Sequence, residues 1–157
     1  MENSEVKHNV FSLSGLVDDC IKMQVAATDA KGVRIVDEVA PSLTVNDDEN
    51  AVSLVLQNLL SNAVKFSYPG GEIRVKAEEQ GRRVWLAVED DGMGIAEKKL
   101  EKIFQFMTSS AQGTGGETGT GIGLFVSKQL VDKMGGEISI KSVKGEGTVV
   151  RFSINKS

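Results

Sequence analysis

The sequence predicts a single α/β domain with a mixed sheet, and three observations support this class. Two segments, at about residues 12–30 and 47–66, carry apolar side chains at the spacing of an amphipathic helix. Short segments elsewhere alternate apolar and polar residues, as half-buried strands do. A turn at Gln80-Gly81 joins two of these segments into a hairpin, so part of the sheet is antiparallel, which argues against an all-parallel doubly wound fold.

Capping residues bound the two long helices. Ser12 or Ser14 can cap the first helix, Gly32 ends it, and Asp47 or Asp48 can cap the second. The remaining elements expected are strands at Val10–Phe11, Val33–Val39 and Leu43–Val45, a hairpin of Ile73–Ala77 and Val84–Val88, a helix over Ala96–Phe104, a helix that follows Gly121 and ends at Met134, and strands at Ile138–Val143 and Val149–Ile154. Residues 1–9 are polar and patternless and are expected to be a disordered tail or the remnant of an upstream linker, so the domain covers residues 10–157.

Composition excludes several classes of protein. The 157 residues suit one domain, and the formal net charge of -4 with a pI near 5.1 disfavours a nucleic-acid or anionic-membrane partner. Cys20 is the sole cysteine and His8 the sole histidine, so neither an internal disulfide nor a Cys/His zinc site is possible. No apolar run is long enough to cross a bilayer or to act as a secretory signal, and we expect a reducing, cytoplasmic location.

Three side chains of the second helix could form one polar face. Asn58, Asn62 and Lys65 fall within about 60° of one another at the border of the apolar stripe, since each residue advances the helix by about 100°. Amide oxygens suit hard cations and an ammonium suits phosphate. A solvated face explains the same residues equally well.

The segment Asp90-Asp91-Gly92-Met93-Gly94-Ile95 directly follows a predicted strand. A carboxylate at a strand end can accept a hydrogen bond from an exocyclic amine, and the glycines allow a base to approach the backbone. By itself the pattern is more often an ordinary acidic turn.

A second glycine cluster, Gly119-Thr120-Gly121-Ile122-Gly123-Leu124, precedes a predicted helix. Free N–H groups at a helix start can bind phosphate. The cluster lacks the Lys-Ser/Thr of a P-loop and the strand lead-in of a dinucleotide-binding fingerprint, and a flexible hinge is the alternative.

In this order and spacing, the motifs resemble the ATP-binding catalytic domain of sensor histidine kinases, from the superfamily that includes gyrase, heat-shock chaperone and mismatch-repair ATPases. Asn58–Phe66 resembles the N box, Asp90–Ile95 the first glycine box, Ile103–Met107 the F box and Gly119–Leu124 the second glycine box. The resemblance runs from about Val10 to Ile154. It implies an α+β two-layer sandwich in which a mixed, mostly antiparallel sheet of about five strands packs on about three helices, with a mobile ATP lid.

The resemblance also implies roles for individual residues. Asp90 would accept from the adenine amino group, Asn62 would ligate Mg²⁺, Lys65 would hold a phosphate, and Asn58 would stand beside the metal as a catalytic residue with Lys65. The remaining cofactor-binding residues would be Phe66, Gly92, Gly94, Ile95, Gly119, Thr120, Gly121, Ile122, Gly123, Leu124 and Thr148. The cofactors would be ATP and Mg²⁺, and the reaction would be phosphoryl transfer.

The partners implied are a phosphoacceptor histidine helix of the parent kinase, a downstream response regulator and the nucleotide itself. No acceptor helix is recognisable: His8 is followed by Asn9-Val10, without an acidic neighbour, so we expect a kinase half that is a monomer. The expected lid, Thr108–Thr118, contains no Lys or Arg. This leaves a nucleotide-binding regulatory module, a related serine kinase and a gyrase-type ATPase as alternatives, although the last would require a glutamate where Asn58 stands.

Overall fold

The structure is a computed structural model and describes residues 6–104 and 123–157. Within these residues one sheet has the strand order β2-β4-β5-β7-β6, and the pair β2-β4 is parallel while the other neighbours are antiparallel. The strands are β2 (Arg34–Asp37), β4 (Glu72–Gln80), β5 (Arg83–Asp90), β6 (Ile138–Val143) and β7 (Gly147–Asn155). The predicted class, a mixed and mostly antiparallel sheet of about five strands, is confirmed.

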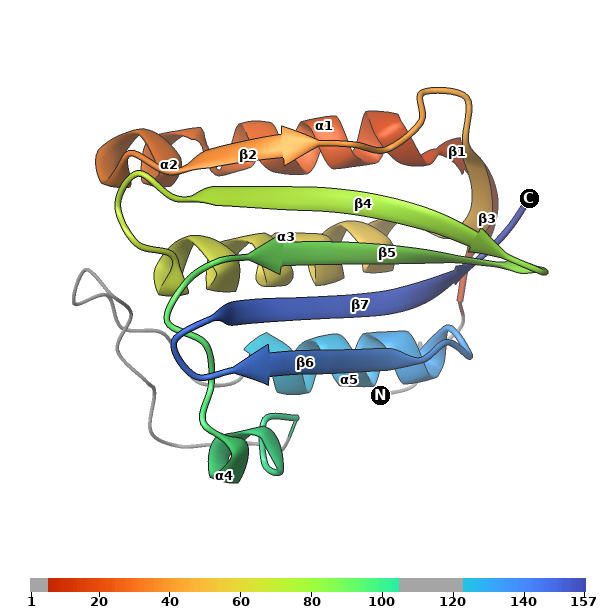
Figure 1. Cartoon of the computed structure of the whole chain (residues 1–157). Helices are drawn as coiled ribbons and strands as arrows, with labels where there is room; N and C mark the ends of the chain where they lie inside the picture. The colour runs from red at the N-terminus through yellow and green to blue at the C-terminus, as the bar shows by residue number, and fades with distance from the viewer. Residues whose placement is uncertain (1–5, 105–122) are drawn as a thin grey trace.

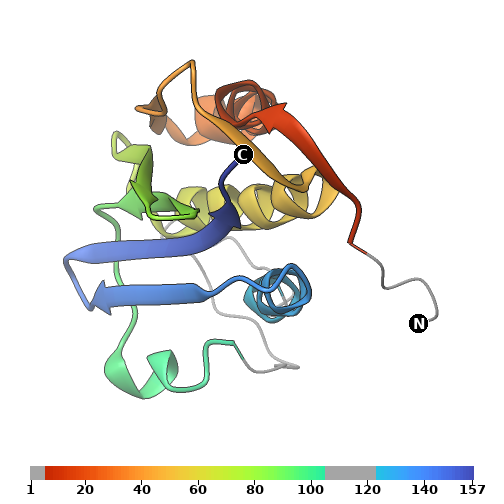
Figure 2. The same ribbon diagram turned by 90° about the vertical axis from the view of Figure 1, so that its right-hand side faces the viewer.

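Helices cover one face of this sheet, and the other face has no helix on it among the described residues (Figures 1 and 2). The helices are α1 (Leu13–Met23), α2 (Val25–Lys31), α3 (Glu49–Phe66), α4 (Glu97–Leu100) and α5 (Gly123–Lys133). The long helix α3 contacts both α1 and α5 and is the centre of the helical layer. The core lies between the layers, where Leu56, Leu60, Leu86 and Phe152 are fully buried.

Helix α3 begins where the sequence predicts. Asp48 is the N-cap, and its Oδ1 accepts from the backbone N–H of Ala51 at 3.1 Å. The neighbouring Asp47 does not cap the helix: its Oδ2 accepts from the backbone N–H of Asn155 at 3.0 Å, which ties the end of β3 (Thr44–Asp48) to the end of β7. Each aspartate therefore joins a local and a distant segment: Asp47 also accepts from the N–H of Asp48 at 2.9 Å, and Asp48 also accepts from the N–H of Lys7 at 3.3 Å.

The first predicted helix is divided into two. Ser12 caps α1 as expected, with its hydroxyl accepting from the N–H of Gly15, but the chain turns at Gln24 and α2 follows. Met23 and Val25 are exposed, so beyond Cys20 no buried stripe holds a straight helix against α3.

Two other boundaries differ from the prediction. Strand β1 (His8–Ser12) pairs antiparallel with β3 and begins two residues before the predicted start, so His8 and Asn9 belong to the fold and not to the tail. The predicted helix over Ala96–Phe104 is reduced to α4: it begins at Glu97 without a side-chain cap, and from Glu101 the chain continues as turns to Phe104. The expected lid, Thr108–Thr118, lies outside the described residues.

Candidate nucleotide-binding site

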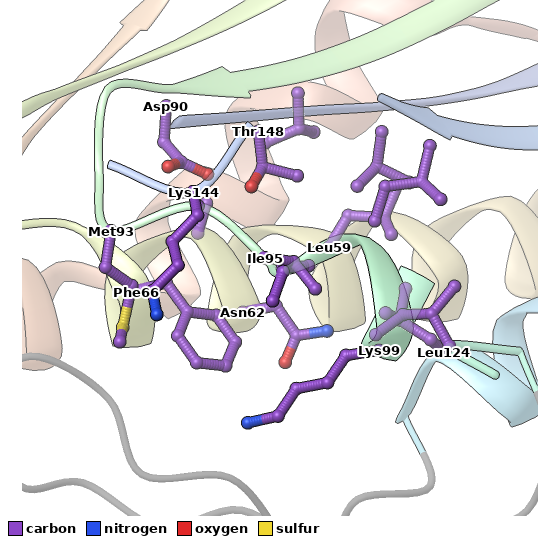
Figure 3. Close-up of a pocket in the computed structure, with 17 residues that line it drawn as sticks. Leu59, Asn62, Phe66, Asp90, Met93, Ile95, Lys99, Leu124, Lys144 and Thr148 are labelled. Carbon is purple, nitrogen blue, oxygen red and sulfur yellow. The ribbon is translucent and has the colours of Figure 1, made fainter. Parts of the chain in front are cut away.

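A cavity of about 340 Å³ lies between the last turns of α3, the loop that follows β5, and the turn between β6 and β7 (Figure 3). Its walls are mostly apolar, from Leu59, Ala63, Val88, Ile140 and Val150 among others. An apolar cavity with a few polar groups is the usual form of a small-molecule site.

Asp90 and Thr148 form one end of the cavity, which we call the floor. They are the last residue of β5 and the second residue of β7, and they are direct partners in the antiparallel ladder. Direct partners place their side chains on the same face of a sheet with Cβ atoms about 5 Å apart. Figure 3 shows the Asp90 carboxylate and the Thr148 hydroxyl pointing the same way into the cavity.

The Asp90 side chain is buried in this apolar setting, and the residue is only 7% exposed. Desolvation raises the pKa of the Asp90 carboxyl from 3.8 to about 6, while the hydrogen bond from the Gly92 N–H at 2.9 Å opposes that shift. The carboxylate is therefore ionised at neutral pH, but at a cost in desolvation. Its Oδ2 has no hydrogen-bond partner among the described residues and is available to a ligand donor.

The two glycines of the Asp90–Ile95 segment serve close backbone contacts. A Cβ on Gly92 would lie 2.1 Å from the carbonyl oxygen of Phe66, so the loop passes directly over the end of α3. Gly94 has φ +68°, and a Cβ there would lie 2.1 Å from the carbonyl oxygen of Val143. Of these two glycines only Gly94 lines the cavity, together with Ile95.

The predicted polar face of α3 is divided between two roles. Asn62 and Phe66 line the cavity, and the Asn62 amide has no hydrogen-bond partner in the described part of the chain. Asn58 does not line it: its Nδ2 donates to the Gly123 carbonyl and to the Ser127 hydroxyl, both at 3.4 Å, and so joins α3 to the start of α5.

Lys65 also lies outside the cavity lining. Its ammonium is 5.0 Å from the ring centroid of Phe66, a cation–π contact with the residue that does line the cavity. The structure thus brings Asn62 and Phe66 to the cavity and leaves Asn58 and Lys65 beside it.

The second glycine cluster is described only at its end. Gly119, Thr120, Gly121 and Ile122 lie outside the described residues, whereas Leu124 lines the cavity and Gly123 is the first residue of α5.

Sequence reasoning missed several residues of the site. Lys99 on α4, Lys144 in the β6–β7 turn and Met93 all line the cavity, and both lysines are exposed. Figure 3 shows Lys99 extended past Asn62, at the opposite end from the floor, and Lys144 beside Phe66. Nothing in the sequence distinguishes Lys99 from the charged residues around it, so its place at the cavity follows from the fold alone.

Asn62 fits a divalent cation. An unengaged amide oxygen at the edge of a cavity is a hard ligand, and Mg²⁺ is usually held by few protein oxygens together with phosphates and waters. Among residues 6–104 and 123–157 no group of three or more His, Cys, Asp or Glu side chains could hold a metal by itself. A cation here would be shared with a phosphate ligand.

Solved structures of histidine kinases share this fold. The catalytic domain of the histidine kinase ThkA superposes with a TM-score of 0.81 at 27% identity, covering 96% of each chain. Full-length ShkA, solved in complex with AMPPNP, gives a TM-score of 0.82 at 27% identity and covers 98% of this chain but 32% of its own. Within the described residues no helix is long and apolar enough to span a membrane.

Sequence comparison identifies the family. An uncharacterized sensor-like histidine kinase of Rhizobium meliloti (strain 1021) is 37% identical over 92% of this chain and 28% of its own length. Sensor protein SrrB of Staphylococcus aureus (strain NCTC 8325 / PS 47) is 32% identical over 99% of this chain and 27% of its own, so the chain spans less than a third of these curated relatives. The model described as "Histidine kinase-, DNA gyrase B-, and HSP90-like ATPase" matches residues 47–157. The chain therefore belongs to this ATPase family, and within it to the catalytic domains of sensor histidine kinases.

Proposed function

We propose that this domain binds Mg-ATP and transfers its γ-phosphate to a histidine on a separate helical phosphoacceptor domain, as the cytoplasmic catalytic step of two-component signalling. The observation that carries the proposal is the buried Asp90 carboxylate at the floor of an apolar cavity whose other end carries the Asn62 amide. A carboxylate that can only accept hydrogen bonds suits the amino group of adenine, and the apolar walls suit its ring.

The roles follow from position. Asn62 would hold Mg²⁺, which on binding neutralises phosphate charge, and Lys99 adds a cation at the same end of the cavity. Phe66 packs against the nucleoside, with Lys65 over its ring. In the transfer, the bond from the γ-phosphorus to the β–γ bridging oxygen breaks, a bond from phosphorus to an imidazole nitrogen forms, and ADP leaves. The phosphorylated partner would then supply a response regulator.

Hydrolysis of the gyrase type is disfavoured by Asn58. A base that activates water would stand four residues before Asn62, but the amide there cannot take up a proton, and it is donating to Gly123 and Ser127. We therefore propose transfer to a partner over transfer to water.

His8 is not a suitable acceptor. It pairs in the sheet with Asp48, the N-cap of α3, whereas Asn62 lies about four turns further along that helix. At 1.5 Å per residue the separation along the helix is about 20 Å, so the histidine cannot meet a γ-phosphate bound near Asn62 in the same molecule.

The test is a transfer assay. The chain is incubated with γ-labelled ATP and Mg²⁺, with and without a phosphoacceptor domain from a sensor histidine kinase. We expect acid-labile label on the added domain, none when its histidine is replaced by alanine, and none on His8. Label on His8, or binding of ATP with no transfer to any acceptor domain tried, would contradict the proposal.

A further inference from the structure

Ser142 of β6 does not line the cavity, but its hydroxyl contacts three groups, of which Ile95 and Thr148 belong to lining residues and Gly147 precedes Thr148 in β7. The backbone N–H of Ile95 lies 2.8 Å from Ser142 Oγ, the carbonyl oxygen of Gly147 lies 2.8 Å from it, and Thr148 Oγ1 lies 2.7 Å from it. Ser142 and Thr148 are direct partners in the ladder between β6 and β7, so the contact between their hydroxyls is built into the register of the sheet.

These three contacts determine where the hydroxyl protons lie. Each contact is short enough to need one proton. The Ile95 N–H supplies the first, and because the Gly147 carbonyl can only accept, Ser142 must donate its single proton there. The third contact then requires Thr148 to donate to Ser142. No other assignment gives each of the three contacts a proton.

Thr148 Oγ1 consequently has only lone pairs left to present to the cavity. Asp90, its ladder partner, also presents only lone pairs when it is ionised. The floor therefore consists of two acceptors side by side, and neither has a proton to offer a ligand (Figure 3).

We propose that Ser142 is a positioning residue that holds the Thr148 hydroxyl as an acceptor, so that the floor selects a purine with a 6-amino group over one with a 6-oxo group. This inference rests on the proposed nucleotide site. An amino group donates two protons and suits two acceptors, whereas a carbonyl oxygen in its place meets two acceptors and no donor, which is costly in a buried site.

The most direct test compares ATP with ITP, which carries a carbonyl oxygen where ATP carries the amino group. Dissociation constants are measured calorimetrically with Mg²⁺ at about pH 8, where Asp90, with its pKa of about 6, is ionised. We expect the wild type to prefer ATP. In Ser142→Ala the Thr148 hydroxyl is free to rotate and donate to the carbonyl, so the ratio of the ITP to the ATP dissociation constant should fall about three- to tenfold.

Three further variants separate positioning from general damage. Ser142→Thr retains the hydroxyl and should keep the wild-type ratio. Ser139→Ala removes a hydroxyl from the same strand that accepts from Arg151 Nε and lies outside the cavity lining, so it should also keep that ratio. Thr148→Val should lower the ratio, and adding Ser142→Ala to it should lower the ratio no further, since both changes act through one hydroxyl.

The outcomes distinguish this inference from the site on which it depends. If Ser142→Ala weakens ATP and ITP binding by the same factor, or leaves both unchanged, the positioning role is wrong although the nucleotide site stands. A lower ratio in Ser142→Ala that falls further in the double variant also overturns it, because the effect would then bypass Thr148. If the wild type binds neither nucleotide, both the site and the inference fail. Thermal melts of each variant show that the ratios refer to folded protein.

Discussion

The backbone N–H of Met93 donates to the carbonyl oxygen of Phe66 at 3.0 Å and joins the loop after β5 to the last residue of α3. The carbonyl oxygen of the same residue, Met93, accepts from the backbone N–H of Gly145 at 2.7 Å. The loop is therefore held between the helical layer and the β6–β7 turn. These two hydrogen bonds set the position of Asp90 relative to Phe66. A substitution that displaces the loop should therefore lower both the stability of the domain and its affinity for nucleotide.

Gly92→Ala tests that attachment. The added Cβ would lie 2.1 Å from the Phe66 carbonyl oxygen and 2.9 Å from Asp90 Oδ1, and backbone cannot move aside as a flexible side chain can. We expect a loss of at least about 2 kcal/mol in the free energy of unfolding and a large loss of nucleotide affinity. Urea denaturation and calorimetry measure the two effects.

The control for that variant is Gly15→Ala in α1, where the added Cβ meets Ser12 Oγ at an ordinary 3.5 Å. There the same substitution should stabilise the domain by up to about 1 kcal/mol, because alanine favours a helix. Equal stability of the Gly92 and Gly15 variants would contradict the contact between the loop and α3.

Asp90→Asn should make the free domain more stable at high pH and a poorer binder. Since burial raises the pKa of Asp90 to about 6, the favourable contribution of its neutral form is fully present below pH 3.8 and is lost as the pH rises through 6. The amide stays neutral, so at about pH 8 the free energy of unfolding of the variant should exceed that of the wild type by about 3 kcal/mol, and near pH 4 most of that difference should be gone.

Asp91→Asn is the matched control for this pH dependence. Asp91 is exposed and pairs with Arg74 at 3.3 Å, an interaction worth at most about 1 kcal/mol at a surface. In urea titrations, Asp91→Asn should show no gain in the free energy of unfolding at high pH.

The affinity of the wild type for ATP should decline as the pH falls below 6, because Asp90 is then protonated. A stability difference for Asp90→Asn that does not change between pH 4 and pH 8 would contradict the burial argument.

Two asparagines one turn apart on α3 should behave differently. Asn62→Ala removes an amide with no partner among the described residues, so stability should change little while Mg-ATP affinity falls by about tenfold. Asn58→Ala instead removes the bonds to Gly123 and Ser127 and should lower the free energy of unfolding by about 1 kcal/mol. Calorimetric titrations with ATP in the presence and absence of Mg²⁺ distinguish the two variants, because only the loss of ATP affinity in Asn62→Ala should depend on the ion.

Sequence reasoning located those residues that carry a local signal. Asp90 stands at the end of an alternating strand and could be assigned from its neighbours alone. Ser12 and Asp48 stand at the starts of periodic helices, where the sequence narrows each cap to one of two neighbouring candidates. Ser142 could not be assigned in this way, because its role depends on the register that places it beside Thr148 and on a loop contact with Ile95, 47 positions away. Neither could the separation of Asn58 from the cavity, since helical spacing gives a shared face but not the helix that packs against part of it.

Lys99 illustrates the same limit and leads to a prediction about phosphate recognition. The sequence offers no Lys or Arg in Thr108–Thr118, yet the fold brings Lys99 from α4 to the end of the cavity where Asn62 lies. An exposed lysine has no periodic neighbours to mark it, so its place follows only from the loop after β5, which carries α4 past the edge strand β6. If it faces the phosphates, its contribution should grow with their number and charge.

Lys99→Gln should therefore weaken ATP binding about three- to tenfold, weaken ADP binding less and leave adenosine unaffected. Lys98→Gln removes the same charge from the adjacent exposed residue, which does not line the cavity, and should change none of the three affinities by more than about twofold. Calorimetric titrations at low and high salt provide the measurement. The effect of Lys99→Gln on ATP affinity should approach its effect on adenosine affinity as salt screens the charge of the lysine. An equal loss for all three ligands would show that Lys99 acts by packing on the cavity wall, and an equal effect of the two glutamine variants would reduce its role to general surface charge.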